Sequence, residues 1–141
     1  MRLAVLDTNV IVSAGIRAGG APATILMEWV LEGLVQLVVS PTVLAEYRDV
    51  AGRDKFAKYG FPPTWLEFAI EDSLWLPEPA PWPFLCPDAK DAPFLALARA
   101  SGAWLVTGNL KHFPEASRGG VRVISPADYL AHLLGPGGDP A

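Results

Sequence analysis

Hydrophobic and polar positions alternate along this chain in short blocks that predict strands and helices in turn. Four apolar blocks have the length and continuity of buried strands, and longer blocks with apolar residues on one or more faces predict helices. The predicted strands cover residues 3–6, 36–39, 104–107 and 121–124. The predicted helices cover residues 9–16, 21–34, 41–51, 63–74, 91–101 and 126–134.

Strands that alternate with helices favour an α/β fold, in which helices cover both faces of a mostly parallel sheet of four or five strands. In such sheets, polar groups beyond the carboxyl ends of the strands share one crevice, which is the usual ligand site. We expect one three-layer α/β/α domain over residues 1–134. The glycine- and proline-rich residues 135–141 predict a flexible tail.

Asp7 raises the first chemical question, because it ends a strand that should be fully buried. An unpaired buried charge is costly, so this carboxylate needs a backbone donor or a metal ion as its partner. As a plain alternative, Asp7 caps the helix that follows it.

Two further carboxylates are predicted to reach the same edge of the sheet. A crossover helix begins at the edge where the preceding strand ends, and Glu46 lies little more than a turn into the helix of residues 41–51. Asp91 begins the helix of residues 91–101, with Asp88 just before it. Glu46 borders an apolar stripe and has a plain alternative as a solvated residue, and Asp91 and Asp88 are rival helix caps.

Thr107 and Asn109 close the third predicted strand at this edge, where their alternative role is to form a turn. Carboxylates that converge repel one another unless a positive charge lies between them, and oxygen ligands suit Mg²⁺ or Mn²⁺. The sequence has no Cys/His spacing typical of zinc, since Cys86 is its only cysteine and His112 and His132 are far apart.

Composition narrows the function classes. The 141 residues carry a net charge of −4, and 51% of them are hydrophobic, which is typical of a globular domain without an overall basic nucleic-acid-binding surface. The single cysteine excludes an internal disulfide framework and fits the reducing cytoplasm, where we expect the protein. No signal peptide or membrane-spanning run is expected.

With these residues in place, the chain resembles the PIN-domain nucleases, and in particular the VapC-like branch assigned as toxin components of toxin–antitoxin pairs. Four stretches carry the resemblance in the order of the family: "VLDTNVIVSA", "VVSPTVLAEYRDV", "CPDAKDAPFLALARASGAWLVTGNLKHFP" and "VRVISPADYL". The resemblance implies a Rossmann-like α/β/α fold, a divalent metal ion and cleavage of single-stranded RNA.

By position, the resemblance implies that Asp7, Glu46 and Asp91 bind the metal ion. It implies that Asn9 supports the first aspartate and that Asp88 is an additional acid. Many relatives carry a fourth acid near the positions of Asn109 and His112. The choice between one and two metal ions therefore stays open. Asn109 has the chemistry to orient a water molecule, and His112 has the chemistry to donate to a phosphate.

Three functions compete for this sequence. The first is a metal-dependent endoribonuclease held inactive by an antitoxin. The second is a haloacid-dehalogenase-type phosphatase, which needs a second aspartate at position 9, where this chain has Asn9. The third is a catalytically weak or inactive PIN-like module that binds RNA or a partner protein.

Two predictions concern surfaces. Arg17 and Arg48 are candidates to hold the phosphate backbone of RNA near the crevice. The segments 21–34 and 63–74 carry apolar residues on more than one face, which predicts that they pair in a homodimer. Burial of the first helix within one domain is the alternative.

Overall fold

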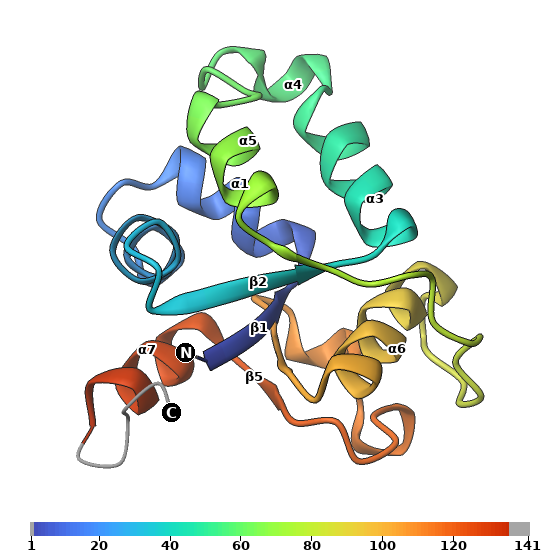
Figure 1. The fold of residues 1–141 in the computed structure, drawn as a ribbon. Coiled ribbons are helices and arrows are strands. Elements are labelled where there is room, and N and C mark those ends of the chain that lie inside the picture. Colours follow the sequence, from blue (N-terminus) through green and yellow to red (C-terminus); the bar gives the residue numbers. More distant parts are fainter. Residues whose placement is uncertain (1, 136–141) are drawn as a thin grey trace.

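A five-stranded parallel sheet forms the centre of the computed structural model, which describes residues 2–135 (Figure 1). Its strands run in the order β3-β2-β1-β4-β5, and each pair of neighbours is parallel. They span β1 (Arg2–Leu6), β2 (Val35–Val39), β3 (Leu74–Trp75), β4 (Trp104–Val106) and β5 (Val123–Ile124). The expectation of a mostly parallel sheet of four or five strands is confirmed.

Helices cover both faces of this sheet, as a parallel sheet with two buried faces requires. In Figure 1, α1, α3 and α5 lie on one side of the sheet and α6 lies on the other. The helical segments are α1 (Thr8–Ile16), α2 (Ala21–Thr24), η1 (Ile25–Val30), α3 (Pro41–Ala51), α4 (Asp54–Ala57), α5 (Thr64–Glu71), η2 (Ala89–Asp91), α6 (Ala92–Ser101), η3 (Leu110–His112), η4 (Glu115–Ser117) and α7 (Pro126–Leu134). The three-layer α/β/α architecture is therefore confirmed.

The strand order reverses at β1. The chain builds outward from β1 to β2 and β3, and then returns to place β4 and β5 on the other side of β1. The carboxyl ends of β1 and β4 are therefore neighbours at a topological switch point, where open α/β sheets form their ligand crevice. The register pairs Leu6 with Val106, so Asp7 and Thr107 follow side by side at this edge.

Two predicted helices differ from the structure. Residues 21–34 form α2 followed by η1, a wider π-helical turn in which the Leu31 N–H donates to the Leu26 carbonyl 3.0 Å away. Neither proline nor glycine marks the widened turn. The predicted helix of residues 63–74 ends at Glu71, because Leu74 pairs with Val38 of β2 and begins β3.

Helix α3 begins as its sequence predicts, with Ser40 at the N-cap and Pro41 at the first helical position. The buried Ser40 hydroxyl makes no capping hydrogen bond. Instead, the carboxylate of Glu78 accepts a hydrogen bond of 2.9 Å from the Thr42 N–H. Farther along α3, the fully buried Tyr47 donates its hydroxyl hydrogen to the carbonyl of Leu6, which ties the helix to the end of β1.

No single helix among residues 2–135 has the length and apolar character needed to cross a membrane. Two helical segments taken together, α1 and residues 21–30, meet these criteria by length and composition alone, but the chain bends sharply between them. The predicted flexible tail lies outside the described residues, apart from Gly135.

Candidate active site

Asp7 lies at the carboxyl end of β1 with only 6% of its surface exposed. Its Oδ2 accepts hydrogen bonds from the Thr107 hydroxyl at 2.7 Å and from the Asn9 amide at 3.3 Å. Asp7 occupies the N-cap position of α1, but its side chain makes no capping hydrogen bond. The Thr8 and Asn9 backbone N–H groups still lower the pKa of Asp7, although the hydrogen bonds that fix its side chain come from Thr107 and the Asn9 amide.

Asn9 and Thr107 form a bridge between the ends of β1 and β4. The side-chain oxygen Oδ1 of Asn9 accepts a hydrogen bond of 3.0 Å from the Gly108 N–H, while the side-chain nitrogen Nδ2 of Asn9 donates to Asp7. The hydroxyl of Thr107 accepts from the Asn109 N–H at 3.1 Å. A Cβ atom at Gly108 would lie 3.3 Å from the Asn9 Oδ1, so a larger residue there would press on this bridge.

Glu46 reaches the same place from α3. The hydroxyl of Thr8 donates to Glu46 Oε2, so the first residue of α1 orients the carboxylate of a residue 38 positions later. Tyr47, the next residue, is bonded to Leu6. Glu46 is thus held toward the edge of the sheet and is not a freely solvated residue.

Asp91 and His112 form the other side of the site. The Nδ1 of His112 lies 3.2 Å from Asp91 Oδ2, yet this buried oxygen accepts no hydrogen bond from the described part of the chain. The contact is thus an ion pair when the imidazole is protonated, without the alignment of a hydrogen bond. Asp88, not Asp91, makes the capping bond here, since it accepts from the Lys90 N–H at 2.9 Å.

These groups line one cavity of about 470 Å³. Of the predicted site residues, those along its wall are Asp7, Asn9, Glu46, Asp88, Asp91 and His112. Thr107 is fully buried and acts on the site through Asp7, and the Asn109 backbone acts through Thr107. Among residues 2–135, the cavity lining includes neither Arg17 nor Arg48, and the Arg48 guanidinium instead lies 3.3 Å from the Glu67 carboxylate.

Burial and mutual repulsion shape the charge of the site. Burial raises the pKa of Asp7, an effect that the Thr107 hydrogen bond partly offsets. Burial, and then the nearby charge of Asp7, raise the pKa of Asp91 to about 6, while His112 lowers it. Two carboxyl groups with raised pKa values beside each other are the electrostatic signature of a functional site that attracts a cation.

Comparison with known proteins assigns this chain to a family. A family model described as the PIN domain matches residues 3–111, which include all three predicted metal-binding acids. The chain belongs to the PIN domain family. A search of curated proteins finds no match.

Solved structures place this PIN domain among known folds. A chain in the crystal structure of VapBC2 from Rickettsia felis, bound to a DNA fragment from their promoter, superposes with a TM-score of 0.60. The two chains are 20% identical, and the match covers 87% of this chain and 98% of the other. A chain of FitAcB from Neisseria gonorrhoeae gives a TM-score of 0.56 at 23% identity, covering 88% and 98%. These likenesses support the fold.

PIN domains generally are nucleases that use divalent metal ions, and the donor set of this PIN domain fits such an ion. Asp7, Glu46 and Asp91 offer only oxygen ligands, and the buried Asp91 Oδ2 lacks a hydrogen-bond donor. Among residues 2–135, no three His, Cys, Asp or Glu side chains already stand closely enough to hold a metal ion. Metal binding therefore requires the acidic side chains to draw closer together than they are here.

Sequence reasoning missed several residues of this PIN-domain site. Thr8 was not singled out, although it holds Glu46. Val50 lines the cavity, and helical spacing signals it, because it follows Glu46 by four positions on one face of α3. Arg53 also lines the cavity but lies just beyond the end of α3, where helical spacing does not apply. Phe56 and Lys90 also line the cavity, from short segments without a recognisable period.

Proposed function

We propose that this PIN domain is a divalent-metal-dependent endoribonuclease that cleaves single-stranded RNA. The observation that supports it is the cavity at the switch point of the sheet, where three acidic side chains from separate segments surround a common space. RNA is a polyanion, so these acids serve a phosphate substrate only together with cations.

Asp7, Glu46 and Asp91 are the residues that would hold Mg²⁺ or Mn²⁺. The bound metal ion supplies an activated water molecule and neutralises charge on the phosphate oxygens. The protein contributes the orientation of the acids: Thr107 and Asn9 hold Asp7, and Thr8 holds Glu46.

Basic side chains on the cavity wall supply the contacts to the phosphate backbone. His112 and Lys90 stand on the wall beside Asp91, and Arg53 stands on the wall beside Glu46. Asp88 and Asn109 support this side of the cavity, Asp88 by fixing the turn before Asp91. Arg17 and Arg48 lie outside the cavity lining, and their proposed contacts are with RNA that extends beyond the site.

Cleavage of a labelled single-stranded RNA in Mn²⁺ tests the proposal. We expect turnover that EDTA abolishes and that Asp7→Asn reduces by at least about a hundredfold, the typical scale for losing a group that acts on the reacting atoms. Preparing Asp7→Asn in parallel by the same protocol controls for contaminating nucleases. Equal turnover by the two proteins would refute the assignment.

We further propose that the protein is the toxin of a toxin–antitoxin pair, that it has a cognate antitoxin and that it acts in the cytoplasm. Support comes from the likeness to a chain of VapBC2, a complex bound in its crystal structure to a DNA fragment from the promoter. Co-expression with the product of the adjacent reading frame tests this proposal, with co-purification and suppression of RNA cleavage as the expected results.

A homodimer is also proposed, through the segments 21–34 and 63–74. Ile25, Leu26 and Val30 are buried within the domain, so the first segment contributes less free surface than its sequence predicts. Phe68 and Trp75 stay 59% and 54% exposed and are the main apolar groups left for a partner. Sedimentation at micromolar concentration tests the proposal, and a 15.1 kDa monomer would refute it.

A second candidate function is a catalytically weak or inactive module that binds RNA or a partner protein. It is favoured by one observation, namely that the acids within residues 2–135 do not already form a three-ligand metal site. Binding of RNA without Mn²⁺-dependent turnover is the result that would select this candidate.

A further inference from the structure

We propose that residues 53–59, here called the α4 arm, hold single-stranded RNA beside the catalytic cavity, with Lys55 and Lys58 on backbone phosphates and Tyr59 stacked on a base. This inference rests on the proposed function and adds the path of the substrate to it. The arm follows α3 after Gly52 and contains α4.

The arm is continuous with the cavity that contains the acids. Arg53 and Phe56, from the arm, line the same cavity as Asp7 and Asp91. The ring of Phe56 packs on the ring of Phe61 with centroids 5.9 Å apart, and the Tyr59 N–H donates to the Phe56 carbonyl at 3.0 Å. These contacts fix the arm as one wall of the site.

The arm has three basic residues, Arg53, Lys55 and Lys58, against one acid, Asp54, in a chain whose net charge is −4. Lys55 and Lys58 are exposed and form no ion pair with an acid of the described chain, whereas Arg53 lies 3.1 Å from Asp49. Lys90 and His112 line the same cavity. A strand of RNA that runs along the arm and the cavity therefore meets basic side chains from separate segments of the chain.

Each lysine of the arm lies beside an aromatic ring. The Lys55 ammonium is 5.0 Å from the centre of the Phe56 ring, and the Lys58 ammonium is 5.2 Å from that of Tyr59. Tyr59 is 46% exposed, which leaves ring surface for a base. Cations interleaved with exposed rings are the pattern that binds single-stranded nucleic acid without sequence readout.

A protein partner fits this surface less well. Lysine is depleted at the centres of protein interfaces, and the exposed positions of the arm include Lys55, Ala57 and Lys58 in place of a contiguous apolar patch. The observations therefore favour RNA as the occupant of the arm.

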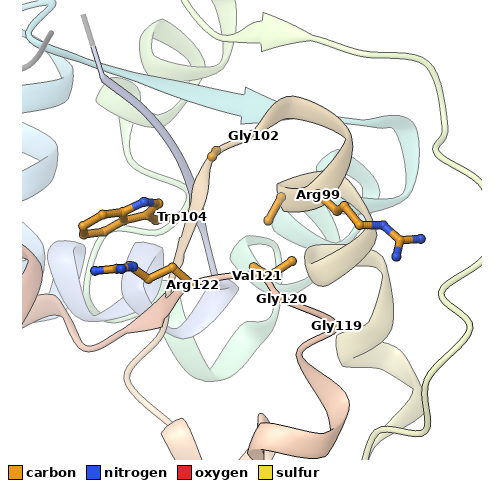
Figure 2. A pocket seen from close by; sticks show the side chains of 9 residues that line it. Arg99, Gly102, Trp104, Gly119, Gly120, Val121 and Arg122 are labelled. Atoms are coloured by element: carbon orange, nitrogen blue, oxygen red, sulfur yellow. The ribbon is translucent and has the colours of Figure 1, made fainter.

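A matched control is available at the opposite edge of the sheet. Arg99 and Arg122 line a separate cavity of about 350 Å³ at the start of β4 (Figure 2). Arg122 lies over the Trp104 ring at 4.6 Å, and Figure 2 shows the two guanidinium groups extending away from each other. Replacing both arginines removes the same net charge as replacing Lys55 and Lys58, but in a cavity separate from the one that the acids line.

The experiment measures fluorescence anisotropy of a short labelled single-stranded RNA of mixed sequence, with Asp7→Asn as the background so that the probe is not cleaved. The salt dependence of binding is compared for Lys55→Gln/Lys58→Gln and for Arg99→Gln/Arg122→Gln. Because each phosphate contact on a single strand contributes about 0.7 to the slope of log K against log salt, we expect the lysine pair to reduce that slope by about 1.4. The arginine pair should leave it unchanged.

The stacking contact has its own test. Tyr59→Leu should weaken binding by about fivefold or more without changing the salt slope, while Phe84→Leu, at an exposed ring outside the arm and the proposed dimer segments, should have no effect. Circular dichroism of each variant checks that the domain is folded.

The outcomes separate this inference from the proposed function. If the Asp7→Asn protein binds RNA and the lysine and arginine pairs give the same slope, the α4 arm is not the RNA contact, although the nuclease proposal stands. That result would leave the arm as a candidate surface for a protein partner. If no protein binds RNA, both proposals fail.

Discussion

The hydroxyl of Thr107 gives the sharpest test of how the site holds its charge. Thr107→Val keeps the shape of the fully buried side chain but removes the 2.7 Å hydrogen bond to Asp7 and the acceptor for the Asn109 N–H. A hydrogen bond to a charged group contributes about 1.5–3 kcal/mol, and a neutral one about 1 kcal/mol. We therefore expect the variant to lose about 2–4 kcal/mol in its free energy of unfolding where Asp7 is ionised.

The loss should depend on pH with a definite sign. Burial raises the pKa of Asp7, and the Thr107 bond works against this rise because it stabilises the carboxylate. At about pH 8 the variant loses a charged hydrogen bond. At about pH 4, the raised pKa of Asp7 leaves more of this carboxyl group protonated in the folded state than in the unfolded state, so the loss should be smaller than at pH 8.

Urea unfolding at both pH values, without metal, measures the effect. Ser73→Ala is the matched control, because its buried hydroxyl donates to the Ala69 carbonyl at 2.8 Å with no charge involved. The loss in the free energy of unfolding caused by Ser73→Ala should be the same at both pH values. A Thr107→Val cost that is equally independent of pH would refute the idea that this hydroxyl supports an ionised Asp7.

Three further predictions follow from the site and its scaffold. Without metal, the free energy of unfolding should fall as pH rises from about 4 to about 6. The pKa of Asp91 is raised to about 6 in the folded state, so its contribution to stability is complete only below its unfolded-state pKa of 3.8 and is lost as pH rises toward 6. Chemical denaturation across this range measures it, and a rise attributable to Asp91 in comparison with Asp91→Asn would contradict it. Asp7→Asn should raise the melting temperature without metal and weaken Mn²⁺ binding in calorimetry, since it removes a repelling charge and a ligand; wild-type affinity in this variant would show that Asp7 is not a ligand. Gly15→Ala should lower the free energy of unfolding by about 1–3 kcal/mol, because the added Cβ would lie 2.3 Å from Phe61 Cζ, whereas Gly19→Ala, with open space around it, is the control.

The sequence predicted the edge of the sheet at which the acids meet, because that prediction needs only the alternation of strands and helices. Asp7 ends a buried strand, and Glu46 and Asp91 lie near the starts of crossover helices, so the topology alone brings them together. A mostly parallel sheet of four or five strands in three layers was predictable for the same reason.

Details that depend on tertiary contact were not predictable. Strand β3 has two residues, Leu74–Trp75, and its apolar side chains continue the pattern of the preceding helix. Helix α4 has only four residues, too few for a hydrophobic period to be recognised. The hydrogen bond from Thr8 to Glu46 joins residues 38 positions apart, and no local pattern signals it.

The sequence also could not show which arginine borders the cavity. Arg48 lies within α3 and pairs with Glu67 on α5, while Arg53 lies just beyond the end of α3 and lines the cavity. Knowing the helix therefore did not suffice without knowing which face borders the cavity.

The bridge between Asp7 and Thr107 has a consequence for synthesis of the protein. These two residues are 100 positions apart, and Asp91 also comes late in the chain. Proteins emerge from the ribosome at roughly 5–20 residues per second, so Asp7 and Glu46 are exposed for seconds before β4 can pair beside β1. A nascent chain that ends before β4 lacks both Thr107 and the strand that brings it to Asp7. The carboxylate cluster is thus assembled only after most of the domain has been made, which delays any chemistry at this site until the chain is nearly complete.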